Sequence, residues 1–180
     1  MILKPQDIVV LAKLITLRNR NDWSQNSIAT ELCLSPSQIN SAFKRLVVAK
    51  LITPYQPPEK PLPILQACEE FLIHGLKYVF PAKQGGITRG VPTGYAAPVF
   101  KGQINLGNDP IPVWPYAEGN EKGMALTPLY SSVPESISKY PNPAFYNLLS
   151  LLDALRSGRA REKQIAEKRL SNILKEGRLG

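Results

Sequence analysis

With 43% hydrophobic and 20% charged residues, the 180-residue chain has the composition of an ordinary globular protein, which excludes disorder throughout. No stretch approaches the ~18 uninterrupted apolar residues of a membrane-spanning helix. The formal net charge of +8 favours a polyanionic partner such as nucleic acid. Near the N-terminus, Lys4, Asp7 and Lys13 interrupt the apolar residues. This argues against a signal peptide, so we expect a cytoplasmic protein.

Two helices are predicted before residue 33. The first runs from about Pro5 to Leu17, with apolar residues at helical spacing and a proline in its first turn. The second has about eight residues and begins after Ser24, a favourable N-cap. Trp23 before the cap and Ile28 within the helix form a hydrophobic staple.

A third helix is predicted from residue 36 to about residue 49. Ser35 is its cap, Pro36 takes the first helical position, and Gln38 completes a capping box. Its buried stripe consists of Ile39, Ala42, Phe43, Leu46 and Val47. Its opposite face carries Ser37, Gln38, Asn40, Ser41, Lys44 and Arg45.

The chemistry of this polar face is that of a DNA recognition helix. Only Cys33-Leu34-Ser35 separates it from the second helix, which predicts a helix-turn-helix. Asn and Gln can bond adenine edges, and Ser can bond bases or phosphates, near the end that enters the major groove. Cations further along can meet phosphates. We therefore predict DNA binding by Ser35, Ser37, Gln38, Asn40, Ser41, Lys44 and Arg45, with base readout by Gln38 and Asn40.

Residues 24–52 resemble the winged helix-turn-helix of MarR-type bacterial transcription regulators. The matching positions are Ser24-Gln25, Ile28-Ala29, Leu32, Leu34-Ser35-Pro36-Ser37, Ile39, Ala42, Lys44-Arg45-Leu46 and Leu51-Ile52. Cys33 and Lys50 stand where glycine is common in that family, and a proline-rich stretch replaces the usual wing. The resemblance implies a DNA-binding transcription regulator that dimerises through terminal helices.

The middle of the chain is rich in proline and glycine. Residues 53–63 hold five prolines in eleven positions, so any hairpin there should be short or irregular. A helix is expected from about Ile64 to His74, ending at Gly75. Residues 76–141 are expected to be mostly ordered loop, with short strands at 76–80 and 123–127. The segment 85–90, with the sequence GGITRG, could cradle a phosphate, but a tight turn with positive φ is the simpler interpretation.

A pair of helices is predicted at the C-terminus. Asn142-Pro143 begins the first, Gly158 breaks it, and a basic amphipathic segment runs from Ala160 to about Leu174. The apolar face of the first helix holds five large residues, which we interpret as a dimer seam, with an internal core as the alternative. These residues are Phe145, Leu148, Leu149, Leu152 and Leu155.

Nothing in the sequence predicts catalysis. Cys33 and Cys68 are expected to be buried free thiols, and with His74 as the one histidine there is no zinc-ligand spacing. Carboxylates in the loops form no spaced pair, so we expect no enzyme activity, no metal and no cofactor.

The sequence thus predicts a mainly α, α+β protein with two parts. Residues 1–60 form a winged helix-turn-helix, and residues 61–180 form a loop-rich accessory region that ends in the helical pair. The predicted function is sequence-specific binding of double-stranded DNA as a homodimer, without membrane contact. The alternative is a protein-interaction module, such as the antitoxin of a toxin–antitoxin pair, in which DNA binding is secondary and residues 76–141 hold the protein partner.

Overall fold

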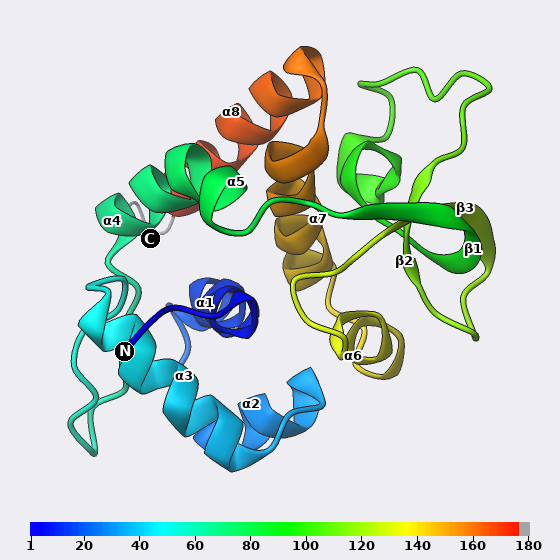
Figure 1. Ribbon diagram of the computed structural model, residues 1–180. Helices are drawn as coiled ribbons and strands as arrows, with labels where there is room; N and C mark the ends of the chain where they lie inside the picture. Colours follow the sequence, from blue (N-terminus) through cyan, green and yellow to red (C-terminus); the bar gives the residue numbers. More distant parts are fainter. Residues whose placement is uncertain (177–180) are drawn as a thin grey trace.

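The computed structural model describes residues 1–176 and has an α+β fold, as expected (Figure 1). No helix in this range is long and apolar enough to cross a membrane. The helical elements are α1 (Pro5–Leu17), α2 (Gln25–Leu32), α3 (Pro36–Val48), α4 (Leu65–Glu70), the π-helical turn η1 (Phe71–Gly75), α5 (Leu76–Val79), the 3-10 turns η2 (Gly94–Ala96) and η3 (Pro98–Phe100), α6 (Val133–Lys139), α7 (Pro143–Ser157) and α8 (Ala160–Glu176). The strands are β1 (Gln84–Pro92), β2 (Pro112–Pro115) and β3 (Glu121–Leu126).

The predicted caps of α2 and α3 are confirmed. The Ser24 hydroxyl accepts a hydrogen bond from the backbone N–H of Ser27 at 3.0 Å. At α3, the Ser35 hydroxyl accepts from the N–H of Gln38 at 3.1 Å, and Gln38 Oε1 accepts from the N–H of Ser35 at 2.8 Å. Cys33 ends α2 with a φ of 54°, a left-handed conformation that glycine adopts at lower cost.

The helix after the proline-rich stretch is longer than predicted. The elements α4, η1 and α5 follow one another without a break, so the helix continues past Gly75 to Val79. The expected helix end at Gly75 and the expected strand at 76–80 are therefore wrong. A Cβ atom at Gly75 would lie 2.9 Å from the ring of Phe71. The glycine therefore permits this close contact inside a π-helical turn, rather than ending the helix.

The strands form one small sheet in which each strand pairs with the other two. β1 is antiparallel to both β2 and β3, while β2 and β3 are parallel. The expected turn at 85–90 is wrong because this segment is part of β1, and none of its glycines has positive φ. Gly90 instead allows β1 and β2 to approach closely, since a Cβ atom added at this position would lie 2.0 Å from the carbonyl oxygen of Trp114. β3 confirms a strand near 123–127.

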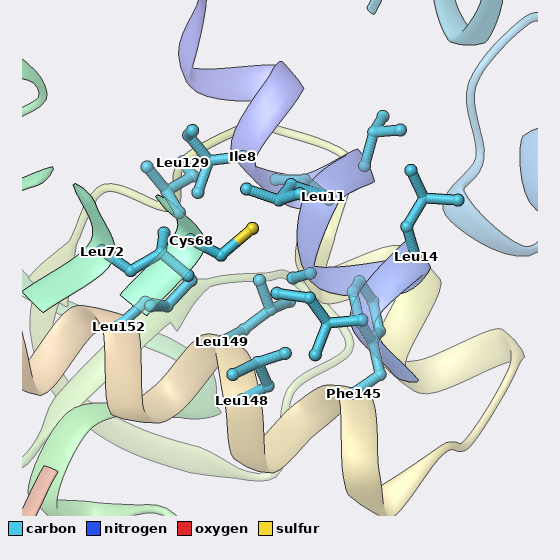
Figure 2. Close-up of a cluster of buried hydrophobic side chains, with 14 of the residues drawn as sticks. Ile8, Leu11, Leu14, Cys68, Leu72, Leu129, Phe145, Leu148, Leu149 and Leu152 are labelled. Atoms are coloured by element: carbon cyan, nitrogen blue, oxygen red, sulfur yellow. The ribbon is translucent and has the colours of Figure 1, made fainter. Parts of the chain in front are cut away.

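Helix α1 lies between α3 and α7, and ten of its 13 residues are buried (Figure 1). One continuous hydrophobic core extends from Ile8 in α1 to Leu174 in α8, so the predicted boundary near residue 60 does not divide it. Figure 2 shows Ile8, Leu11 and Leu14 of α1 in the same cluster as leucines of α7, with Cys68 among them.

The predicted dimer seam on α7 is covered by the chain itself. Its five apolar side chains are each at most 2% exposed and belong to the core cluster of the chain. They are Phe145, Leu148, Leu149, Leu152 and Leu155. Figure 2 shows four of them in the cluster that also holds Cys68 and residues of α1. The seam interpretation of these residues is therefore wrong, and they belong to the internal core.

A buried carboxylate fastens the sheet to α7. Asp153 accepts hydrogen bonds from the Thr93 hydroxyl at 2.8 Å, the Trp114 indole N–H at 2.6 Å and the Arg156 guanidinium at 2.8 Å. Arg156 also donates to the carbonyl of Phe80 at 2.8 Å, in the segment that leads into β1. A buried charge is tolerated when it is paired and hydrogen-bonded in this way.

Candidate nucleic-acid interface

Four of the predicted site residues form a stripe along the outer side of α3. Ser37 and Lys44 are exposed, and Asn40 and Ser41 are half-buried. Their spacing of three and four residues places them on one helical face, which we call the outer stripe. None of the four has a hydrogen-bond or ion-pair partner within residues 1–176, so their polar groups are free to bind a ligand.

Gln38 is committed to contacts within the chain. Its Oε1 is used in the capping box with Ser35, and its Nε2 donates to the hydroxyl of Tyr130 at 3.0 Å. Tyr130 belongs to the loop between β3 and α6, which therefore reaches the first turn of α3. Because both ends of the amide are occupied, Gln38 is placed to orient α3. The sequence offers no signal for this contact, since the two residues are 92 positions apart.

Arg45 is also engaged inside the fold. Its Nε and Nη2 donate to the two carboxylate oxygens of Asp7 at 2.7 and 2.8 Å. The Asp7 side chain is fully buried and that of Arg45 is 11% exposed. The hydrogen bond to Asp7 raises the pKa of Arg45. Of the two adjacent cations in the predicted site, only Lys44 is exposed.

Contacts on α2 hold the turn before α3 in place. Gln25 Nε2 donates to the carbonyl of Pro36 at 3.0 Å, which joins the start of α2 to the start of α3. At the other end of α2, the Ser136 hydroxyl of α6 donates to the carbonyl of Glu31, and the carboxylate of Glu31 pairs with Lys13 of α1. The orientation of α3 therefore depends on both α1 and the accessory region.

An irregular hairpin follows α3, as the prolines predict. The N–H of Thr53 donates to the carbonyl of Leu62 at 2.9 Å, and isolated bridges join Ile52 to Pro63 and Gln56 to Glu59. The hairpin contains one cation, Lys60, whose ammonium lies 4.8 Å from the centre of the Trp23 ring. The hairpin thus offers little free positive charge for phosphate.

A second basic surface lies on α8. Apart from Glu176 at its end, the exposed polar residues of this helix are Arg161, Gln164, Lys168, Asn172 and Lys175. The sequence mixes acids with these cations, but Glu162 is buried and accepts a hydrogen bond from the N–H of Arg159 at the start of the helix. The acids and bases of α8 are therefore partly separated on different faces.

The structure offers little for metal or thiol chemistry. No group of three or more His, Cys, Asp or Glu residues in the described range is arranged to hold a metal ion. Cys68 is buried, as predicted, and burial raises its pKa to about 12. Cys33 is only half-buried, so the expectation of full burial is wrong there, although desolvation still raises its pKa. Both thiols are free.

In comparisons with known proteins, no family model matches the chain, and neither a curated protein nor a solved structure is significantly similar to it. The resemblance to MarR-type regulators therefore depends on residues 24–52 alone.

Proposed function

We propose that the chain is a cytoplasmic bacterial transcription regulator that binds double-stranded DNA through the outer stripe of α3, as a winged helix-turn-helix protein. The observation that carries this proposal is the free state of Ser37, Asn40, Ser41 and Lys44 on one helical face. Hydroxyl and amide groups precede a cation along α3, which is the order a helix needs when its first turns enter the major groove.

The internal contacts divide the predicted site into two roles. Asn40, Ser37 and Ser41 are the candidates for base contacts, and Lys44 is the candidate for a phosphate contact. Gln38 and Arg45 act as positioning residues because their donors bind Tyr130 and Asp7. Ser35 fixes the first turn of α3 through its cap. Because it is exposed, it is also a candidate for contact with the DNA backbone.

The test is selection of binding sites from a random duplex pool, followed by fluorescence anisotropy over a range of salt concentrations. Asn40→Ala should relax preference at one base position per half-site, worth about 1–3 kcal/mol. Lys44→Ala should weaken binding to all sequences and lower the salt slope by about one unit. Lys101→Ala, which removes an exposed cation far from α3 in the sequence, is the matched control. A pool that yields no enriched sequence would contradict the proposal.

One observation favours the alternative, a protein-interaction module such as an antitoxin. Ile87 of β1 is 55% exposed. Nearby, the exposed cations Arg89 of β1 and Lys122 of β3 lie directly opposite each other in the strand register. Two neighbouring cations that have no ion-pair partner within residues 1–176 would attract an acidic protein partner, and Ile87 beside them offers it an apolar contact. In that case the product of an adjacent, co-transcribed gene should copurify with the chain, and Ile87→Glu should abolish the copurification.

A further inference from the structure

A cavity of about 410 Å³ lies where the sheet meets the turn between α7 and α8. Pockets that hold small molecules have volumes of about 300–1,000 Å³, so this one is large enough for a ligand. Its walls come from β3, the loop before β2, η2 and the start of α8. The apolar lining residues are Pro110, Pro112, Met124, Ala125, Leu126 and Ala154. No residue of α3 lines the cavity, so it is separate from the outer stripe.

Two glycines in the lining shape the walls of this cavity. Gly94 begins η2 with a φ of 56°, a left-handed conformation that glycine adopts at low cost. At Gly158, a Cβ atom would lie 2.5 Å from the carbonyl oxygen of Ala154 and 3.0 Å from the Cβ of Glu162. Glycine at this position therefore lets the end of α7 approach the first turn of α8 closely, which brings Glu162 to the cavity wall.

The carboxylate of Glu162 has one oxygen free in this wall. Glu162 lines the cavity and is only 7% exposed. Its Oε2 accepts a hydrogen bond from the backbone N–H of Arg159 and so caps α8. Its Oε1 has no hydrogen-bond or ion-pair partner within residues 1–176. A charged oxygen of a buried side chain is costly to leave unpaired, so Oε1 is placed to accept a hydrogen bond from a ligand.

The other charges of the lining cancel each other. Besides Glu162, the charged lining residues are Asp109 and Arg159. Arg159 Nη2 lies 3.8 Å from Asp109 Oδ2, and both side chains are largely exposed. Gln84, also in the lining, is exposed and neutral. The lining therefore carries one net negative charge, although the chain as a whole has a net charge of +8. A cavity of this sign favours a cation.

The hydroxyl groups of the lining offer acceptors rather than donors. The Ser157 hydroxyl donates to the carbonyl of Asp153 at 2.7 Å, and the Tyr95 hydroxyl donates to the carbonyl of Pro110 at 3.5 Å. Burial raises the pKa of Tyr95, and the charge of Glu162 raises it further, so this hydroxyl keeps its proton at neutral pH. Because both hydroxyl hydrogens are used within the chain, a ligand meets the lone pairs of the two oxygens.

We propose that this cavity binds a small protonated primary amine with an apolar body. An ammonium group has three donors and no acceptor, which complements the oxygens of Glu162, Tyr95 and Ser157. The apolar body would lie against Met124 and Leu126 of β3. The proposal does not depend on DNA binding, because none of these groups belongs to the outer stripe.

Isothermal titration calorimetry with the full chain tests the proposal. The probes are tryptamine and hexylamine, with indole-3-propionate and indole-3-ethanol as the anionic and neutral counterparts of tryptamine. At least one amine should bind with a Kd of about 1 mM or lower, and both counterparts should bind more weakly than tryptamine. Glu162→Gln removes the charge but keeps an acceptor for the cap, and it should raise the Kd about tenfold or more. Glu167→Gln makes the same charge change on α8 outside the lining and is the matched control.

The proposal is overturned if neither amine binds at millimolar concentration, or if indole-3-propionate binds as tightly as tryptamine. Equal effects of Glu162→Gln and Glu167→Gln, with unchanged circular dichroism, also overturn it. Met124→Trp fills the cavity without altering the cap of α8, so amine binding that survives this change would place the site elsewhere. DNA binding is read separately by anisotropy. A chain that binds an amine but no DNA contradicts the proposed function alone, and one that binds DNA but no amine contradicts the cavity assignment alone.

Discussion

The guanidinium of Arg45 in α3 donates two hydrogen bonds to the carboxylate of Asp7 in the first turn of α1. Asp7 also accepts a hydrogen bond from the backbone N–H of Lys4 at 2.8 Å. Its carboxylate therefore both caps the start of α1 and forms the ion pair with Arg45. The pair fixes the angle between α1 and α3, and thereby the direction in which the outer stripe faces.

We expect Arg45→Ala to destabilise the whole fold. Removing one partner of a buried ion pair leaves an uncompensated charge and costs about 3–5 kcal/mol. Lys44→Ala, at the neighbouring exposed position, should change the free energy of unfolding by less than about 0.5 kcal/mol. Urea denaturation followed by circular dichroism measures both. Equal stability of the two variants would mean that the ion pair does not hold the helices together.

Leu152→Arg should unfold the chain rather than produce a folded monomer. Leu152 is fully buried in the core shared by α1 and α7, and a charge there has no partner. The milder Leu152→Ala should cost about 2–5 kcal/mol through loss of burial and the cavity that remains. Gln164→Arg, at an exposed position of α8, serves as the control. A folded, monomeric Leu152→Arg protein would restore the seam interpretation.

The exposed pair of Arg89 and Lys122 should be a source of local instability. The two residues are directly opposite on the antiparallel strands β1 and β3. The carbonyl of Arg89 accepts a hydrogen bond from the N–H of Tyr116, on the β2 side, so Arg89 and Lys122 form a non-hydrogen-bonded pair with closely spaced side chains. Lys122→Glu should therefore stabilise the protein by about 0.2–1 kcal/mol.

Salt provides the check on that electrostatic cause. The gain from Lys122→Glu should shrink as ionic strength rises, because the Debye length falls from about 10 Å at 0.1 M to about 3 Å at 1 M. Lys101→Glu makes the same charge change away from the strand pair and should give a smaller gain. Thermal denaturation at 0.05 and 1 M NaCl compares the two. A gain independent of salt would exclude like-charge repulsion.

The two thiols should differ in reactivity in the native protein. Burial raises the pKa of Cys68 to about 12, so at pH 8 roughly one molecule in 10⁴ carries its thiolate, which is the reactive form. Cys33 is half-buried and should react faster with a disulfide reagent, although its pKa is raised as well. In Cys33→Ser, reaction should require unfolding. Rapid native labelling of that variant would show that the core around Cys68 opens readily.

Local features of this fold can be predicted from the sequence, and distant pairings cannot. The cap at Ser35 and the proline after it define the start of α3 within a few residues, so periodicity and capping place the helix correctly. The contact between Gln38 and Tyr130 depends on the packing of the loop before α6, and Arg45 meets Asp7 across 38 positions. Neither contact has a local signature, so both side chains were expected to face DNA.

The errors in the middle of the chain have the same physical origin. The glycines of β1 resemble a turn when read alone, because the reason for Gly90 is the carbonyl of Trp114 on another strand. Gly75 resembles a helix end for the same reason, since its requirement comes from the ring of Phe71. In both cases a close contact with another residue requires the glycine. Sequence patterns instead suggest a turn or a helix end, because the contacting residue cannot be recognised from the sequence.

Because α1 lies at the centre of the fold, the first three helices depend on the rest of the chain. A fragment of residues 1–60 would keep the outer stripe but expose the side of α1 that α7 normally covers. We therefore expect that this fragment does not fold alone. The first three helices are then not an independent domain that could function when fused to another protein. For the same reason, any event that loosens α7 or α8 lowers the stability of α3 as well.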